Sequence, residues 1–105
     1  MIQKLQLSKE QMISIIQNGL QKTNSPKNVT IIGAGISGLV AASLLKEAGH
    51  QVTIIEANNR IEGRIYTKRE PFINNQYVDL GAMRIPSFHY LVIEYIKKFN
   101  LQVNE

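Results

Sequence analysis

The sequence of 105 residues contains no cysteine. A thiol nucleophile, a disulfide framework and a cysteine-ligated metal are therefore excluded, although the redox compartment is left open. No run of about 18 apolar residues is present that could span a membrane. The N-terminus, MIQKLQLSKEQ, also lacks an apolar core before a small-residue cleavage site. We therefore expect a cytoplasmic protein without a membrane span.

The charge pattern is equally plain. The net charge is +4, but the basic residues are scattered and form no stripe with interleaved aromatic residues. Nucleic acid is therefore not an expected partner. His50 and His89 have no metal-ligating partner at a suitable spacing, so no metal site is expected. Hydrophobic residues make up 44% and charged residues 19%, which is typical of one small globular domain.

The N-terminal 28 residues predict a helix followed by a linker. Ser8 and Gln11 have the spacing of a capping box, and apolar residues then recur at helical intervals until about Gly19. The polar run from Gln21 to Asn28 has the composition of a turn or linker. We therefore divide the chain into a helix and linker at 1–28 and a second, incomplete domain at 29–105, and expect the helix to be a packing element.

The next segment predicts a βαβ unit. Two short β-branched runs, 29–32 and 52–55, enclose a glycine-rich turn at 33–38 and a helical pattern at 39–48 that Gly49 should end. The fold class is therefore α/β, an incomplete Rossmann-like βαβ unit with flanking helices.

The remaining segment predicts weaker elements. Asn74 and Asn75 indicate a turn between short strands or extended loops. Ser87 is expected to cap a last helix, which Asn100 should close.

The glycine-rich turn predicts a dinucleotide site. Gly33, Gly35 and Gly38 follow a strand and open a helix, as the G-x-G-x-x-G fingerprint requires. The first permits a tight turn, the second lets the backbone approach a pyrophosphate, and the third allows close packing of helix on strand. Glu56 ends the second strand, where a carboxylate can accept both ribose hydroxyls and would repel a 2′-phosphate. FAD or NAD is therefore favoured over NADP, while a βαβ unit with incidental glycines remains the alternative.

Residues 60–67, Arg-Ile-Glu-Gly-Arg-Ile-Tyr-Thr, resemble the R-x-G-G-R-x-x-T segment of the flavin-dependent amine oxidases. In that family the glycine and arginine residues lie along the diphosphate and ribose of FAD. Glu62 stands where the family has its first glycine, which places an anionic side chain near the pyrophosphate or pointing away from it.

Residues 79–86, Asp-Leu-Gly-Ala-Met-Arg-Ile-Pro, resemble the L-amino-acid oxidase branch of the same family. There the Gly-x-Met-Arg loop passes beside the flavin ring, and its arginine pairs with the α-carboxylate of the substrate. The resemblance implies Arg84 as the substrate contact, with a structural ion pair between Arg84 and Asp79 as the alternative. It implies a cofactor site made of Gly33, Ala34, Gly35, Ile36, Ser37, Gly38, Glu56, Ala57, Arg60, Gly63, Arg64, Gly81, Ala82 and Met83.

The activity implied by the resemblance is oxidation of an amino acid or amine by FAD, giving a 2-oxo acid, ammonia and hydrogen peroxide from an amino acid. The family's catalytic domain is several times longer than this chain. Three hypotheses therefore stay open: part of an oxidase that needs a second chain and is inactive alone, a non-catalytic FAD- or NAD-binding module, and a non-functional remnant.

Overall fold

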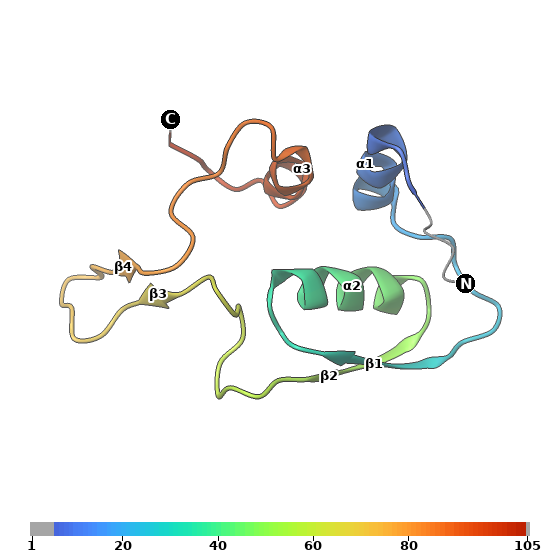
Figure 1. Cartoon of the computed structure of the whole chain (residues 1–105), viewed down its shortest axis with the longest axis horizontal. Coiled ribbons are helices and arrows are strands. Elements are labelled where there is room, and N and C mark those ends of the chain that lie inside the picture. Colours follow the sequence, from blue (N-terminus) through green and yellow to red (C-terminus); the bar gives the residue numbers. More distant parts are fainter. Residues whose placement is uncertain (1–5, 105) are drawn as a thin grey trace. The chain divides into compact units, whose positions relative to one another are not determined.

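A computed structural model describes residues 6–104, which form two compact units. Among these residues, one unit combines 6–20 and 85–104, and the other comprises 21–84. Figure 1 follows the elements along the chain. These contacts group the last helix with the first one, whereas the domain boundary expected from the linker composition lies at residues 28 and 29.

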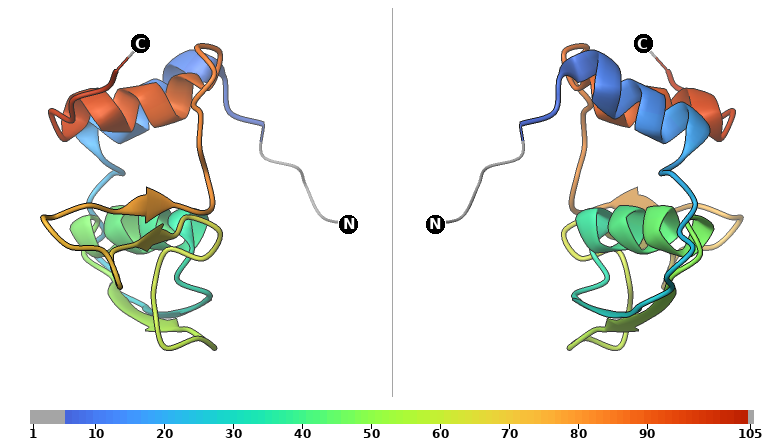
Figure 2. Two further views of the ribbon diagram at one scale, coloured as in Figure 1. Left: turned by 90° about the vertical axis from the view of Figure 1, so that its left-hand side faces the viewer. Right: turned by 90° about the vertical axis from the view of Figure 1, so that its right-hand side faces the viewer.

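The larger unit is built on a parallel βαβ arrangement, as the sequence predicts. Strands β1 (Asn28–Ile32) and β2 (Gln51–Ile55) pair in register from Asn28 opposite Gln51 to Ile32 opposite Ile55. Helix α2 (Ile36–Glu47) connects them and lies along one face of the strands (Figure 2). Its end is a Schellman motif, because Gly49 has a φ of 103° and its N–H donates to the Lys46 carbonyl at 3.0 Å.

Alternation along the two strands separates a covered face from an open one. Residues at alternate positions are half-buried, and Ile31 lies on the α2 side, where a Cβ on Gly38 would contact it at 3.4 Å. Ile32 and Ile55 have the opposite parity and are 88% and 55% exposed. The β1–β2 sheet therefore carries a facing pair of isoleucines on the side that α2 does not cover.

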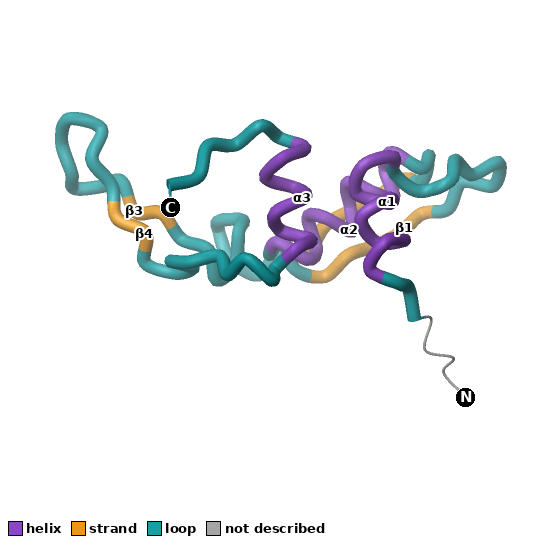
Figure 3. Tube along the Cα trace, turned by 90° about the horizontal axis from the view of Figure 1, so that it is seen from above, coloured by secondary structure: helices purple, strands orange, loops and turns teal. Residues whose placement is uncertain are grey.

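A short hairpin follows in the same unit. Strands β3 (Thr67–Lys68) and β4 (Val78–Asp79) are antiparallel, and a long loop joins them (Figure 3). The predicted Asn74–Asn75 turn is confirmed, because both residues have positive φ, 55° and 58°, and the Gln76 N–H donates to the Ile73 carbonyl at 3.1 Å. Asparagine tolerates this left-handed conformation better than most residues.

The other unit is a pair of helices. Helix α1 (Lys9–Asn18) begins with the predicted capping box, in which the Ser8 hydroxyl accepts from the Gln11 N–H at 3.1 Å and the Gln11 side chain accepts from the Ser8 N–H at 2.8 Å. It packs on α3 (Tyr90–Lys98) and buries Ile16. Two polar contacts support the pair: Gln17 donates to Glu94 at 3.1 Å, and the Lys98 ammonium donates to the Ile16 carbonyl at 2.8 Å. The expected packing role of α1 is confirmed.

The sequence predicts the end of α3 correctly but not its beginning. The N-cap predicted at Ser87 is wrong, because the His89 N–H donates to the Pro86 carbonyl at 2.9 Å and closes a turn there, which delays the helix until Tyr90. The predicted end is confirmed. Asn100 has a φ of 51°, and the N–H groups of Asn100 and Leu101 donate to the last free carbonyls of the helix, at Lys97 and Ile96.

Candidate functional site

The glycine turn has the conformation that its sequence predicts. Gly33 has a φ of 98°, which favours glycine, and its N–H extends the β1–β2 ladder by donating to the Ile55 carbonyl at 2.7 Å. A Cβ on Gly38 would overlap the Gly33 carbonyl oxygen. The third glycine therefore lets the first turn of α2 pack directly against the backbone at the end of β1.

The N-terminus of α2 is open. Gly35 is its N-cap, and none of the side chains of residues 6–104 caps the helix. Among the same residues, a Cβ on Gly35 would have no neighbour within 4 Å, so this glycine lies beside open space. Uncapped N–H groups and the helix dipole make such a terminus suitable for an anion.

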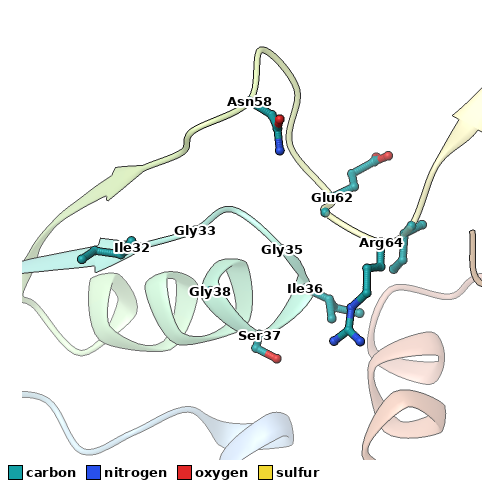
Figure 4. A pocket seen from close by; sticks show the side chains of 11 residues that line it. Ile32, Gly33, Gly35, Ile36, Ser37, Gly38, Asn58, Glu62 and Arg64 are labelled. Atoms are coloured by element: carbon teal, nitrogen blue, oxygen red, sulfur yellow. The ribbon is translucent and has the colours of Figure 1, made fainter.

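A pocket of about 560 Å³ lies at this terminus (Figure 4). Seven of the expected cofactor residues line it: Gly33, Gly35, Ile36, Ser37, Gly38, Gly63 and Arg64. Glu62, which the sequence marks as a departure from the family motif, also lines it, together with three residues that the sequence did not single out: Ile32, Asn58 and Ile65. The glycine turn and the arginine-rich loop thus form one concavity, as two halves of a single nucleotide site would.

Glu56 is held in place by the backbone. One carboxylate oxygen accepts from the Ala34 N–H at 2.7 Å and the other accepts from the Asn58 N–H at 2.9 Å. These bonds, the one from Asn58 first, hold the pKa of Glu56 below its ordinary value, so the ionised form is favoured. Each oxygen still has a lone pair for a further donor such as a ribose hydroxyl. The Asn58 contact was not expected, although its position two residues after a carboxylate fits a local side-chain-to-backbone bond.

The loop after Glu56 is joined to the glycine turn through Glu62. The Glu62 N–H donates to the Ala34 carbonyl at 2.8 Å, and Glu62 forms an isolated parallel bridge with Gly35. A Cβ on Gly63 would contact the Gly35 Cα at 3.2 Å. The loop therefore runs directly beside the second glycine of the fingerprint.

Glu62 adopts a glycine conformation. Its φ is 84°, a region that side chains rarely occupy, so the backbone itself explains why a glycine would suit this position. In Figure 4 its side chain extends away from the glycine turn. A glutamate at this position therefore strains the backbone, and the residue still belongs to the pocket lining.

Arg60 and Arg64 occupy different environments. Arg64 lines the pocket, whereas the guanidinium of Arg60 lies outside the lining and donates to backbone carbonyls of its own loop. Ala34, Glu56 and Ala57 adjoin the glycine turn or β2 without lining the pocket.

The 79–86 segment contacts the 60–67 segment. The Leu80 N–H donates to the Tyr66 carbonyl at 2.8 Å, and a Cβ on Gly81 would overlap the Arg64 carbonyl. Asp79 accepts from the Thr67 hydroxyl at 2.6 Å, and within residues 6–104 it forms no ion pair with Arg84. Ala82, Met83 and Arg84 follow as exposed residues, with Met83 80% exposed.

The sequence predicts neither a metal site nor a membrane-spanning segment. The structure brings together no three metal-ligating side chains in the part of the chain that it describes. His50 Nδ1 accepts from the Lys27 N–H at 3.2 Å, so this histidine has a backbone partner. Among the helices of residues 6–104, none is long and apolar enough to cross a membrane. The cytoplasmic location stays a prediction.

Comparison with known proteins agrees with these motifs. Residues 36–105 match the model of a family described as flavin containing amine oxidoreductase. The candidate L-amino-acid oxidase YobN of Bacillus subtilis is 54% identical over 98 residues, and the L-amino acid oxidase Lm29 of Lachesis muta is 52% identical over 96 residues. These alignments cover 93% and 91% of the chain but only 20% and 18% of the two relatives.

A solved structure is also similar. Wild-type putrescine oxidase with bound putrescine superimposes with a TM-score of 0.62 and 32% identity, over 73% of this chain and 17% of that one. The expected flavin cofactor agrees with the family description. The sequence relatives, the matching structure and the paired glycine and arginine motifs converge on one conclusion: the chain belongs to the flavin-containing amine oxidoreductase family.

Proposed function

We propose that the chain is the FAD-binding N-terminal part of a flavin-dependent L-amino-acid oxidase, with a Rossmann-like βαβ unit as its nucleotide site. The observation that carries this proposal is the pocket at the N-terminus of α2, to which the glycine turn and the 58–65 loop both contribute. The uncapped helix terminus and the open space beside Gly35 fit a pyrophosphate.

The nucleotide half of the cofactor would be bound by residues of the glycine turn, the end of β2 and the following loop. Glu56 would accept the ribose hydroxyls, and Arg64 would pair with the pyrophosphate. The remaining members of this set are Gly33, Ala34, Gly35, Ile36, Ser37, Gly38, Ala57 and Gly63. Arg60 would support this site by hydrogen bonding to the backbone of its own loop.

The flavin ring and the substrate would lie toward the second motif. The backbone of Gly81, Ala82 and Met83 would approach the ring, and Arg84 would bind the α-carboxylate of the amino acid. Bound FAD would supply the redox chemistry of the site, the two-electron oxidation of the substrate at Cα with oxygen as the final electron acceptor. Arg84 would contribute by orienting the substrate, since its guanidinium has no ion pair among residues 6–104.

The rest of the reaction requires further polypeptide. The chain spans about a fifth of the length of the curated relatives that it matches. We propose that the chain alone does not turn over amino acids and that a second polypeptide completes the oxidase in the cytoplasm. The released products would then be a 2-oxo acid, ammonia and hydrogen peroxide.

A titration tests the nucleotide site. Flavin fluorescence is followed as the purified chain is added to FAD, with Glu56→Ala as the variant. Saturable binding that Glu56→Ala weakens at least tenfold is the expected result. A folded chain that leaves FAD fluorescence unchanged would refute the assigned cofactor site.

A chimera tests the substrate contact. The chain is joined to the part of the Bacillus subtilis relative that follows its aligned region, and peroxide formation is measured with a panel of L-amino acids. Arg84→Lys should raise KM more than it lowers kcat, because it removes a bidentate carboxylate contact. An unchanged KM would remove Arg84 from the substrate site.

A further inference from the structure

The guanidinium of Arg60, an exposed residue, makes its hydrogen bonds within its own loop. One guanidinium nitrogen donates to the Gly63 carbonyl at 2.8 Å, and the other donates to the carbonyls of Ile61 and Ile65, each at 3.3 Å. The guanidinium carbon also lies 4.5 Å from the ring centroid of Tyr66. A planar, forked cation can make all these contacts together, whereas a single ammonium cannot.

These bonds surround the strained residue of the loop. Ile61 and Gly63 flank Glu62, so Arg60 fixes the carbonyls on both sides of the residue whose φ is 84°. A side chain at positive φ persists only where its surroundings enforce the conformation. Glu62 in turn binds the Ala34 carbonyl through its N–H.

The same contacts determine where Arg64 lies. The Arg60 guanidinium donates hydrogen bonds to the carbonyls of Gly63 and Ile65, the two neighbours of Arg64. Arg64 lines the pocket, while Arg60 does not. The two arginines of the motif therefore have separate environments, one facing the space where an anion would bind and one facing the loop's own backbone.

We propose that Arg60 is a positioning residue, which holds the 61–65 backbone against the glycine turn and thereby places Arg64, and that it makes no contact with the cofactor phosphates. This inference rests on the proposed function only for the identity of the ligand. The effect of the Arg60 guanidinium on the conformation of the 61–65 loop can be measured without any flavin.

The first test is amide hydrogen exchange of the ligand-free chain, followed by NMR. Arg60→Gln and Arg60→Lys should both accelerate exchange of the Glu62 and Ile65 amides by about tenfold or more, because the bonds that hold their loop are lost. The amides of β1 and β2 are the internal reference and should keep their protection. Arg64→Gln is the matched control, which should leave the Glu62 and Ile65 amides unchanged.

Two outcomes of this test would overturn the inference. One is wild-type exchange at Glu62 and Ile65 in both Arg60 variants. The other is loss of protection throughout β1 and β2 in Arg60→Lys, because the proposed role is confined to the loop.

The second test measures FAD affinity between low and high salt. An ion pair with a phosphate is screened by salt, so Arg64→Gln should flatten the salt dependence of binding. Arg60→Gln should weaken binding by about tenfold in the wild-type chain but have little further effect in a chain that already carries Arg64→Gln, since it acts through the placement of Arg64. Fully additive losses of affinity in the double variant would show that Arg60 acts on the ligand independently of Arg64 and would refute the proposal. If the wild-type chain binds no FAD, the proposed function fails, and the exchange result still decides the role of Arg60.

Discussion

The close packing between the first turn of α2 and the end of β1 can be tested with Gly38→Ala. The added methyl group would overlap the carbonyl oxygen of Gly33, which is backbone and cannot rotate away. Overpacking of this kind costs about 3 kcal/mol at the upper end of its usual range. Alanine favours a helix over glycine by up to about 1 kcal/mol, which offsets part of that cost.

The expected net loss is therefore about 2 kcal/mol of unfolding free energy, or roughly 8–16 °C in Tm for a chain of this size. Urea unfolding and thermal melting, both followed by circular dichroism, measure it. Gly35→Ser is the matched control, because nothing lies within 4 Å of a Cβ there and serine is a good N-cap. This control should melt within a few degrees of the wild type, but it should bind FAD more weakly because its side chain occupies the pocket. A Gly38→Ala chain as stable as the wild type would refute the packing argument.

Three further predictions concern backbone conformation and charge. Glu62→Gly should raise the unfolding free energy by about 0.5–1 kcal/mol, because relief of the positive φ exceeds the entropy cost of glycine. The control Glu62→Gln keeps the strain and should leave the unfolding free energy unchanged. Equal unfolding free energies of the two variants in urea would contradict the assignment of strain. The pKa of Glu56 is held low by the N–H groups of Asn58 and Ala34, so its contribution to stability is present above the ordinary glutamate pKa and is lost as the pH falls through the lowered one. An NMR titration of the Glu56 carboxyl checks the direction, and the acid loss of stability should shrink in Glu56→Gln. Asn100→Val should destabilise α3 by about 1–2 kcal/mol while Asn100→Gly should not, measured as helix signal during thermal melting; equal effects would show that the left-handed C-terminal residue is unimportant.

Much of the βαβ unit is predictable because local chemistry determines it. The β-branched runs on either side of the glycine turn specify two paired strands, and the helix between them ends where glycine permits a positive φ. The capping box and the Asn100 terminus are predictable for the same reason, since each depends on neighbours within a few residues. Ser87 failed as an N-cap because a turn that starts at Pro86 competes with the first turn of α3.

Other features depend on contacts between segments that are far apart in the chain. A single sequence does not show which of these segments will make contact. Nothing in the pattern of α1 specifies α3 as its partner, because many amphipathic faces could pair. The site shows the same limit. Gly33, Gly35 and Gly38 could be assigned from their spacing, but the roles of Arg60 and Glu62 depend on which carbonyls and which φ the folded loop presents. A positively charged residue in a hydrophilic stretch gives no sign that its partners are backbone oxygens.

The pairing of α1 with α3 also has a consequence for the order of folding. The hydrogen bonds between these helices join residues 77 and 82 positions apart, whereas the βαβ unit forms from neighbours in the chain. Closing so long a loop has an entropic cost that prior folding of residues 21–84 would reduce. The helix pair should therefore assemble last. During synthesis α1 leaves the ribosome before residues 90–98 and keeps Ile16 and its other apolar side chains uncovered until they follow, so the nascent chain is open to chaperones and to self-association in that interval.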